Sequence, residues 1–251
     1  MSRFKRGRAV AIALGVAVSG AFMAPAEATS FHITQAIVPS NPGALIANIY
    51  YPGLGPSGSI DVRIGRIQLN GTDEGGFPAS LDTYCADIFD VLQPGIFTTA
   101  DISTAPFSAA RLTAATTFLA HADALVTNST TSAAAQLGLW EILYENSGTS
   151  WNVTSGTFHS DITSSAANKA NTWLGYLANN DWQPDPTLSL ELLVPQQGNQ
   201  LQVRLVAGSP AGLPGDVPEP ASWAMMLGGF GMIGGTLRRR RFSVDAGKAA
   251  A

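Results

Sequence analysis

Residues 133–144 read Ala133-Ala134-Ala135-Gln136-Leu137-Gly138-Leu139-Trp140-Glu141-Ile142-Leu143-Tyr144. At helical spacing this stretch brings four large side chains to one face, namely Leu137, Trp140, Leu143 and Tyr144. A stripe of this kind packs against a core, so the pattern predicts a helix over residues 131–146. Thr131 or Ser132 is its expected N-cap, because a hydroxyl there accepts from the free N–H groups of the first turn.

Two further segments have helical periodicity. Residues 108–126 are rich in Ala and repeat Leu and Phe at helical spacing. Residues 161–179 form the third expected helix, with Asp161 as its N-cap.

Strand-like segments stand on both sides of the three helices. They are rich in β-branched and aromatic residues and are separated by Gly, Pro and Asn turns. The expected strands cover residues 31–38, 44–51, 59–69 and 80–92 before the helices, and the hairpin strands 187–194 and 200–207 after them. This order predicts an α+β domain, in which a β-sandwich or sheet carries a three-helix insertion.

The first residues have the pattern of a secretory signal peptide. Four basic side chains precede an apolar stretch that runs from Ala9 to about Met23. Ala26-Glu27-Ala28 then gives a small-x-small cleavage site, with cleavage expected after Ala28 by the secretion machinery. The alternative is an uncleaved N-terminal anchor.

Charge and cysteine content exclude two classes of protein for the body of the chain. Residues 29–217 contain five basic and fifteen acidic side chains, a formal net charge of −10. So few cations cannot neutralise a run of phosphates, which argues against nucleic-acid binding. A single cysteine, Cys85, excludes a disulfide framework.

The C-terminal part combines three features in a fixed order. A Pro-Glu-Pro motif is followed by an uncharged stretch from Ala221 to Leu237 and then by four arginines. As a helix the uncharged stretch would be about 25 Å long, slightly short of a hydrocarbon core, and the arginines would stay on the cytoplasmic side of the membrane. The residues that define the pattern are Pro218, Glu219, Pro220, Trp223, Ala224, Arg238, Arg239, Arg240 and Arg241.

This tail closely resembles the PEP-CTERM sorting signal of Gram-negative bacteria, in its Pro-Glu-Pro-x-x-Trp-Ala variety. The resemblance implies a transmembrane sorting helix in the inner membrane and recognition by an exosortase, an integral-membrane processing enzyme. It also implies an association with exopolysaccharide and biofilm matrix. The alternative is an ordinary membrane anchor. The expected organisation is a signal peptide (1–28), one extracytoplasmic domain (29–207), a Gly/Pro linker (208–217), the sorting segment (218–241) and a cytoplasmic tail (242–251).

Cys85 and Gln136 are the candidate reactive residues. Cys85 follows an aromatic residue on an expected strand, and Gln136 opens a Gln-x-small-x-Trp pattern on an expected helix. The pair resembles the thioester domains of bacterial surface adhesins, in which the Cys sulfur and the Gln side-chain carbonyl join in an internal thioester. The resemblance implies that Tyr84 and Trp140 frame the bond. The sequence differs from those domains at Gly138, where they usually have Ala.

The alternative for Cys85 and Gln136 is a purely structural role, because free Cys is often buried as a small hydrophobe. The three histidines are scattered without metal-ligand spacing, and no metal or cofactor is expected. The sequence therefore favours a non-enzymatic envelope or matrix protein that is exported and binds exopolysaccharide or a surface ligand. A covalent adhesin with a Cys85–Gln136 thioester is the alternative.

Overall fold

The described part of the chain, in a computed structural model, covers residues 28–146, 150–162, 165–196 and 198–208. The expected signal peptide, apart from Ala28, and the expected sorting segment lie outside the described residues. Among the described residues, no helix is both long and apolar enough to cross a membrane.

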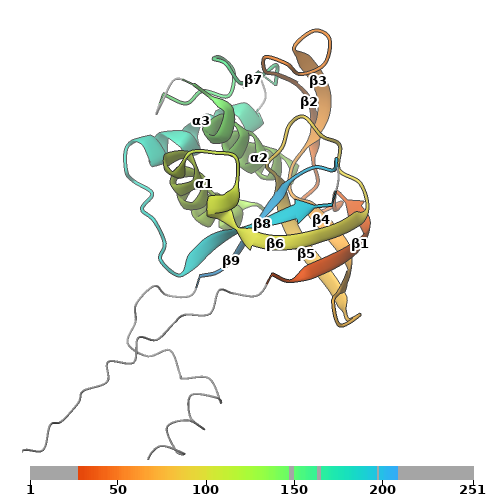
Figure 1. The fold of residues 1–251 in the computed structure, drawn as a ribbon. Helices are drawn as coiled ribbons and strands as arrows, with labels where there is room; N and C mark the ends of the chain where they lie inside the picture. Colours follow the sequence, from red (N-terminus) through yellow and green to blue (C-terminus); the bar gives the residue numbers. More distant parts are fainter. Residues whose placement is uncertain (1–27, 147–149, 163–164, 197, 209–251) are drawn as a thin grey trace, which may run out of the picture.

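Six antiparallel strands close into a barrel (Figure 1). Around the barrel they follow the order β1, β4, β5, β9, β8 and β6. Their bounds are β1 Ser30–Ile37, β4 Ile67–Asp73, β5 Pro78–Cys85, β6 Gly95–Asp101, β8 Leu188–Pro195 and β9 Gln202–Ala207. Because the barrel is closed, these six strands leave no open sheet edge along their paired lengths.

The α+β class is confirmed, and the barrel replaces the expected sandwich or open sheet. The strand that closes the barrel is β6, which pairs with β1 on one side and β8 on the other. Residues 95–101 were not predicted as a strand, because they lack the strong alternation of polar and apolar residues that marks a half-buried strand. Only the pairing of distant segments reveals the closure.

A sharp turn at Gly65 and Arg66 divides one expected strand into two. The single strand predicted over residues 59–69 is wrong, since β3 (Ser59–Ile64) ends before this turn and β4 begins after it. Gly65 has a φ of 151°, and a Cβ atom there would lie 2.7 Å from Ser132 Oγ. Glycine is therefore required where the chain leaves one sheet for the other.

β3 belongs to a second, three-stranded sheet that stands beside the barrel. Its order is β3-β2-β7, with β2 at Leu45–Tyr50 and β7 at His159–Ser160. The strand expected at residues 80–92 is shorter than predicted, because β5 ends at Cys85.

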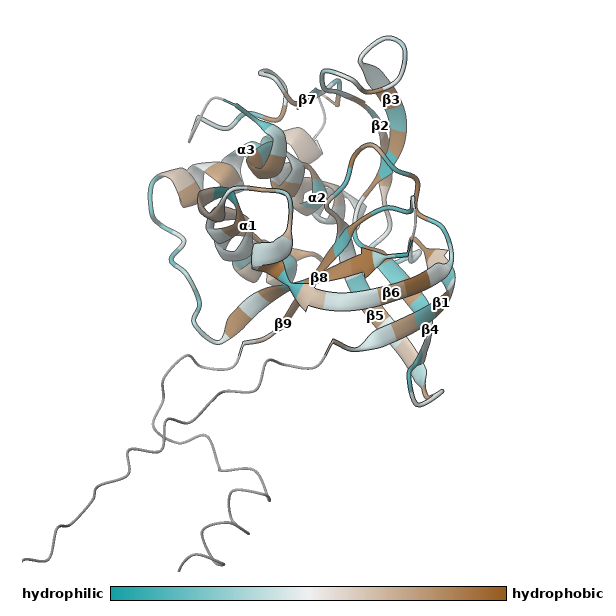
Figure 2. Cartoon of the chain, in the orientation of Figure 1, coloured by the Kyte–Doolittle hydropathy of each residue, from teal (hydrophilic) through white to brown (hydrophobic). Residues whose placement is uncertain are grey.

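Three helices pack together on one side of the barrel (Figure 1). They are α1 Ala109–Ala122, α2 Ser129–Tyr144 and α3 Ser165–Ala178, and two short 3-10 turns, Ile102–Thr104 and Asp123–Leu125, flank α1. Apolar residues are prominent on β8, and along the helices they alternate with pale and hydrophilic ones (Figure 2). The sequence prediction of three helices is confirmed, although β7, which was not predicted, lies between α2 and α3 in the chain.

Helix α2 is the centre of the larger core. Every residue from Ser132 to Tyr144 is buried, so the helix is enclosed on all sides and not only along the predicted stripe. Gly138 packs against the Phe118 ring of α1, where an added Cβ atom would collide with that ring. This contact gives a packing reason for glycine at the position where the thioester domains usually have Ala.

Both predicted N-caps are wrong. The cap of α2 is Asn128, whose side chain accepts from the Thr131 N–H at 3.0 Å, while Thr131 Oγ1 accepts from the Asn128 N–H. The two residues thus form a reciprocal capping box. Asp161 does not directly precede α3, which begins at Ser165; its carboxylate accepts from the Asn48 N–H at 3.0 Å and ties the chain after β7 to β2.

Candidate functional site

Cys85 lies at the end of β5, beyond the last residue of β5 that pairs with β4. The ladder between β4 and β5 ends at the pair of Ile67 and Thr83, because the turn at Gly65 carries the chain out of the barrel. On the opposite side β9 still pairs with Tyr84 and Cys85. Along a strand, the N–H and C=O groups of successive residues point alternately to the two neighbouring strands. The N–H and C=O groups of Cys85 therefore point to the side where β4 no longer pairs with β5.

The Gln136 carboxamide occupies that place. Its Oε1 accepts from the Cys85 N–H at 2.9 Å, and its Nε2 donates to the Cys85 carbonyl oxygen at 2.8 Å. The side chain thereby supplies the two hydrogen bonds that a neighbouring strand would have made. The structure therefore brings together the two residues that the sequence singled out.

The Cys85 side chain is buried at the same point. Its thiol donates to the Asp87 carbonyl oxygen at 2.7 Å. Burial raises the pKa of the Cys85 thiol far above its usual range, the backbone of Asp87 opposes this shift, and the Asp87 carboxylate adds to it. Burial is the largest cause and keeps this thiol neutral.

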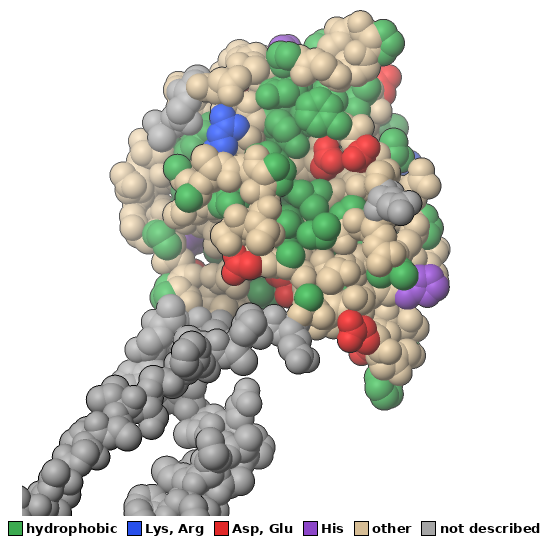
Figure 3. All heavy atoms as spheres, in the orientation of Figure 1, with side chains coloured by type: hydrophobic (Ala, Val, Ile, Leu, Met, Phe, Trp, Pro, Cys, Tyr) green, Lys and Arg blue, Asp and Glu red, His purple; other side chains and the backbone are tan. Residues whose placement is uncertain are grey.

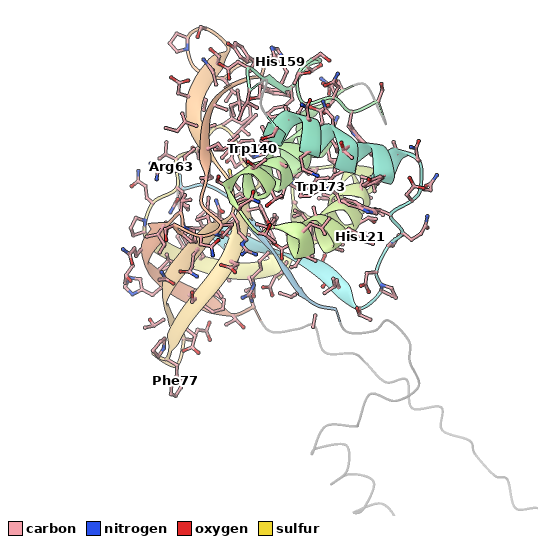
Figure 4. All side chains as sticks on the ribbon, turned by 180° about the vertical axis from the view of Figure 1, so that it is seen from behind. Arg63, Phe77, His121, Trp140, His159 and Trp173 are labelled. Atoms are coloured by element: carbon pink, nitrogen blue, oxygen red, sulfur yellow. The ribbon has the colours of Figure 1, made fainter. Side chains whose placement is uncertain are left out.

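A groove of about 580 Å³ opens above the pair. Cys85, Gln136 and Trp140 line it, together with apolar side chains from β2, β3 and the loop after β5. Asp61, Arg63 and Asp90 are its charged residues. Figure 4 shows Trp140 on α2 within the fold and Arg63 at its outer edge. The groove therefore extends to both candidate residues, of which Cys85 is 3% and Gln136 1% exposed.

Tyr84 and Trp140, the two aromatic residues predicted to frame the thioester, do not both lie at the groove. Trp140 lines the groove, whereas Tyr84 is not among the residues that line it. Tyr84 instead donates its hydroxyl to Asp123 Oδ1 at 2.6 Å, and Asp123 also pairs with Arg66 at 3.3 Å. Neighbouring residues of a strand point to opposite faces, so Tyr84 and Cys85 cannot both face the groove.

Gln200 is a residue of the site that the sequence analysis missed. Its Nε2 donates to the carbonyl oxygens of Asp87 and Asp90, both at 2.9 Å. These bonds hold the loop after β5 beside the groove. Gln200 lies in the expected hairpin, more than a hundred positions from Cys85, and no local pattern distinguishes it from an ordinary polar residue.

Exposed apolar side chains lie on the same loop. Phe89 and Val91 both line the groove and are 53% and 71% exposed. Figure 3 shows apolar side chains gathered on one face of the domain, with acidic side chains among them.

Two buried carboxylates follow Trp140 on the chain. Glu141 Oε1 accepts from the Asn152 N–H at 2.7 Å, and Glu141 Oε2 has no hydrogen-bond partner among the described residues. Glu145 accepts from the Thr157 N–H at 2.7 Å. Burial raises the pKa of Glu141 to about 8, the bond from Asn152 opposes the shift, and the charge of Glu145 adds to it. Glu141 is therefore largely protonated at neutral pH.

Two of the histidines stack on aromatic rings. His121 stacks on Trp182 with ring centres 5.1 Å apart, and His159 stacks on Tyr50 at 4.7 Å. In the described ranges, no group of three or more His, Cys, Asp or Glu side chains is arranged to hold a metal ion.

Glu141 makes the stability of the protein pH-dependent. Its pKa is raised in the folded state above the ordinary value of 4.5, so the folded protein keeps a proton that the unfolded chain releases. We expect its stabilising contribution to be complete below about pH 4.5 and to be lost as the pH rises through about 8. Urea unfolding from pH 5 to pH 9 measures this trend, which amounts to a few kcal/mol. Glu141→Gln keeps an acceptor for Asn152 and should flatten the profile; equal profiles for both proteins would contradict the assignment.

Comparison with known proteins identifies the tail and not the barrel domain. Residues 216–241 match the family described as the PEP-CTERM protein-sorting motif. No curated protein and no solved structure matches the chain significantly. The match covers all nine residues that define the sorting pattern, although they lie outside the described residues. The chain therefore carries a PEP-CTERM protein-sorting motif, the signal of an exported protein that an exosortase sorts through a membrane-anchored intermediate to the cell envelope.

Proposed function

We propose that this protein is a non-enzymatic component of the cell surface or biofilm matrix of a Gram-negative bacterium. The single observation that carries the proposal is the sorting motif at residues 216–241, joined to a folded domain that ends close to it. Secretion machinery exports the chain, the tail holds it in the inner membrane, and the exosortase releases or transfers the domain. The domain then acts outside the cytoplasm on exopolysaccharide or another surface ligand.

The described domain is consistent with action outside the cytoplasm. Its excess of acidic side chains favours a soluble, non-aggregating surface. Its sole cysteine is 3% exposed where it lines the groove, which limits its contact with an oxidising compartment. At the expected start of the mature chain, the Thr29 N–H donates to Thr99 Oγ1 at 2.8 Å, which ties this residue to the barrel.

Deletion of residues 217–241 should leave export intact and move the protein from the membrane fraction to the soluble fraction. The reason is that the apolar segment and the four arginines are the expected membrane anchor. Fractionation followed by immunoblotting measures the distribution. As a matched control, Glu219→Ala keeps the apolar segment and should remain in the membrane fraction. A truncated chain that still fractionates with the membrane would contradict the assignment.

A second candidate function is favoured by the contact between Gln136 and Cys85. The carboxamide whose carbon would be attacked is held against the residue that carries the attacking sulfur. In a covalent adhesin, the Cys85 sulfur bonds to the Gln136 carbonyl carbon and the carbon–nitrogen bond breaks. The thiol proton leaves with the amide nitrogen as ammonia, so atoms and charge balance.

The geometry favours this reaction in two ways. Gln136 Oε1 already accepts from the Cys85 N–H, and that donor would stabilise negative charge on the oxygen as the sulfur attacks. The groove also gives access to the bond after it has formed. An amine or hydroxyl of a target molecule could then attack the carbonyl carbon and release Cys85 as a thiol, leaving the protein covalently attached to its target.

Intact-mass measurement distinguishes the two functions. We expect the exported protein, purified without added amines, to be lighter than its sequence by one ammonia if the thioester forms. Cys85→Ala cannot form the bond and should match its sequence mass. A wild-type mass equal to the sequence, with one titratable thiol, would contradict the covalent function and leave Cys85 with a structural role.

A further inference from the structure

The Trp140 indole N–H is a buried donor without an acceptor. Trp140 is 3% exposed, and its Nε1 has no hydrogen-bond partner among the described residues. Burying an unpaired donor is unfavourable, and buried polar groups in proteins are nearly always paired. An unsatisfied donor beside a candidate reactive site therefore calls for a functional explanation.

The position of Trp140 on α2 places it beside the pair. Trp140 follows Gln136 by four residues, so the two side chains lie on the same face of the helix. Both line the groove with Cys85. The ring is also packed against Phe158, with ring centres 6.2 Å apart, which restricts its orientation.

The Trp140 side chain affects the Cys85 thiol, although its N–H makes no hydrogen bond of normal geometry to the sulfur in the resting structure. Among the effects on the pKa of the Cys85 thiol, burial is the largest and raises it, whereas the polar Trp140 side chain lowers it. The resting thiol is neutral, and a neutral cysteine sulfur is only a weak acceptor. The donor is thus in place before negative charge develops on the sulfur.

We propose that the Trp140 indole N–H stabilises negative charge on the Cys85 sulfur during thioester chemistry. This inference rests on the proposed covalent function. Charge develops on the sulfur twice, first when the thiol loses its proton for attack on the Gln136 carbonyl carbon and again when the sulfur leaves as a target amine takes its place. A fixed donor in a buried site stabilises such charge without reorganising as the reaction proceeds.

Trp140→Phe removes the N–H and keeps an aromatic ring, and Trp173→Phe is the matched control. Trp173 is likewise buried, at 4% exposure, but lies on α3 and does not line the groove. The full exported chain of each variant is compared with wild type for release of ammonia and for reaction of the thioester with methylamine, both followed by intact mass. We expect both rates to fall about 10- to 100-fold in Trp140→Phe, as for loss of a hydrogen bond to a charged group, and to stay within about twofold in Trp173→Phe.

Two results would overturn the inference, and they differ from failure of the covalent function. Wild-type rates in Trp140→Phe, with the thioester present, would remove the role of the indole. If the wild-type chain has a free thiol instead, the covalent function fails. Alkylation of Cys85 at a fixed alkaline pH then decides the role of Trp140: slower alkylation in Trp140→Phe than in Trp173→Phe supports a donor to the sulfur, and equal rates contradict it. Thermal unfolding of each variant checks that the fold is intact.

Discussion

The hydrogen-bond pair between the Gln136 carboxamide and the Cys85 backbone connects the helical half of the domain to the barrel. It is needed because the turn at Gly65 ends the pairing of β4 with β5, while β5 continues to Cys85. The buried N–H and C=O groups of Cys85 therefore have no strand neighbour on that side. An unpaired buried backbone group costs about 1–3 kcal/mol, so a side chain that fills the gap stabilises the strand end. The same contact fixes the carboxamide beside the only cysteine.

The sequence predicted the local elements better than their assembly. Helical periodicity located α2, and the Cys85 and Gln136 motifs identified a pair that the structure joins. Closure of the barrel could not be predicted, because β6 has little alternation of its own and is held by its partners β1 and β8. The roles of Gly65 and Gln200 likewise depend on contacts with residues far away in the sequence.

Burial gives the site two opposed properties. It keeps the Cys85 thiol and the Glu141 carboxyl protonated, which suits a stable core around α2. It also excludes water from a sulfur, a carboxamide and an indole N–H, the conditions under which a few fixed donors most affect reactivity. The sorting motif determines where such a domain is delivered, while the groove determines what it contacts there.

The central claim, that Gln136 replaces a missing strand neighbour of Cys85, is tested most directly by hydrogen exchange of the Cys85 amide. In the wild-type protein this amide should exchange as slowly as the Ala100 amide in the β6–β8 ladder. In Gln136→Leu, which keeps the side-chain bulk and removes the acceptor, Cys85 should lose at least about tenfold protection while Ala100 keeps its own. Unchanged protection of Cys85 in that variant would contradict the account.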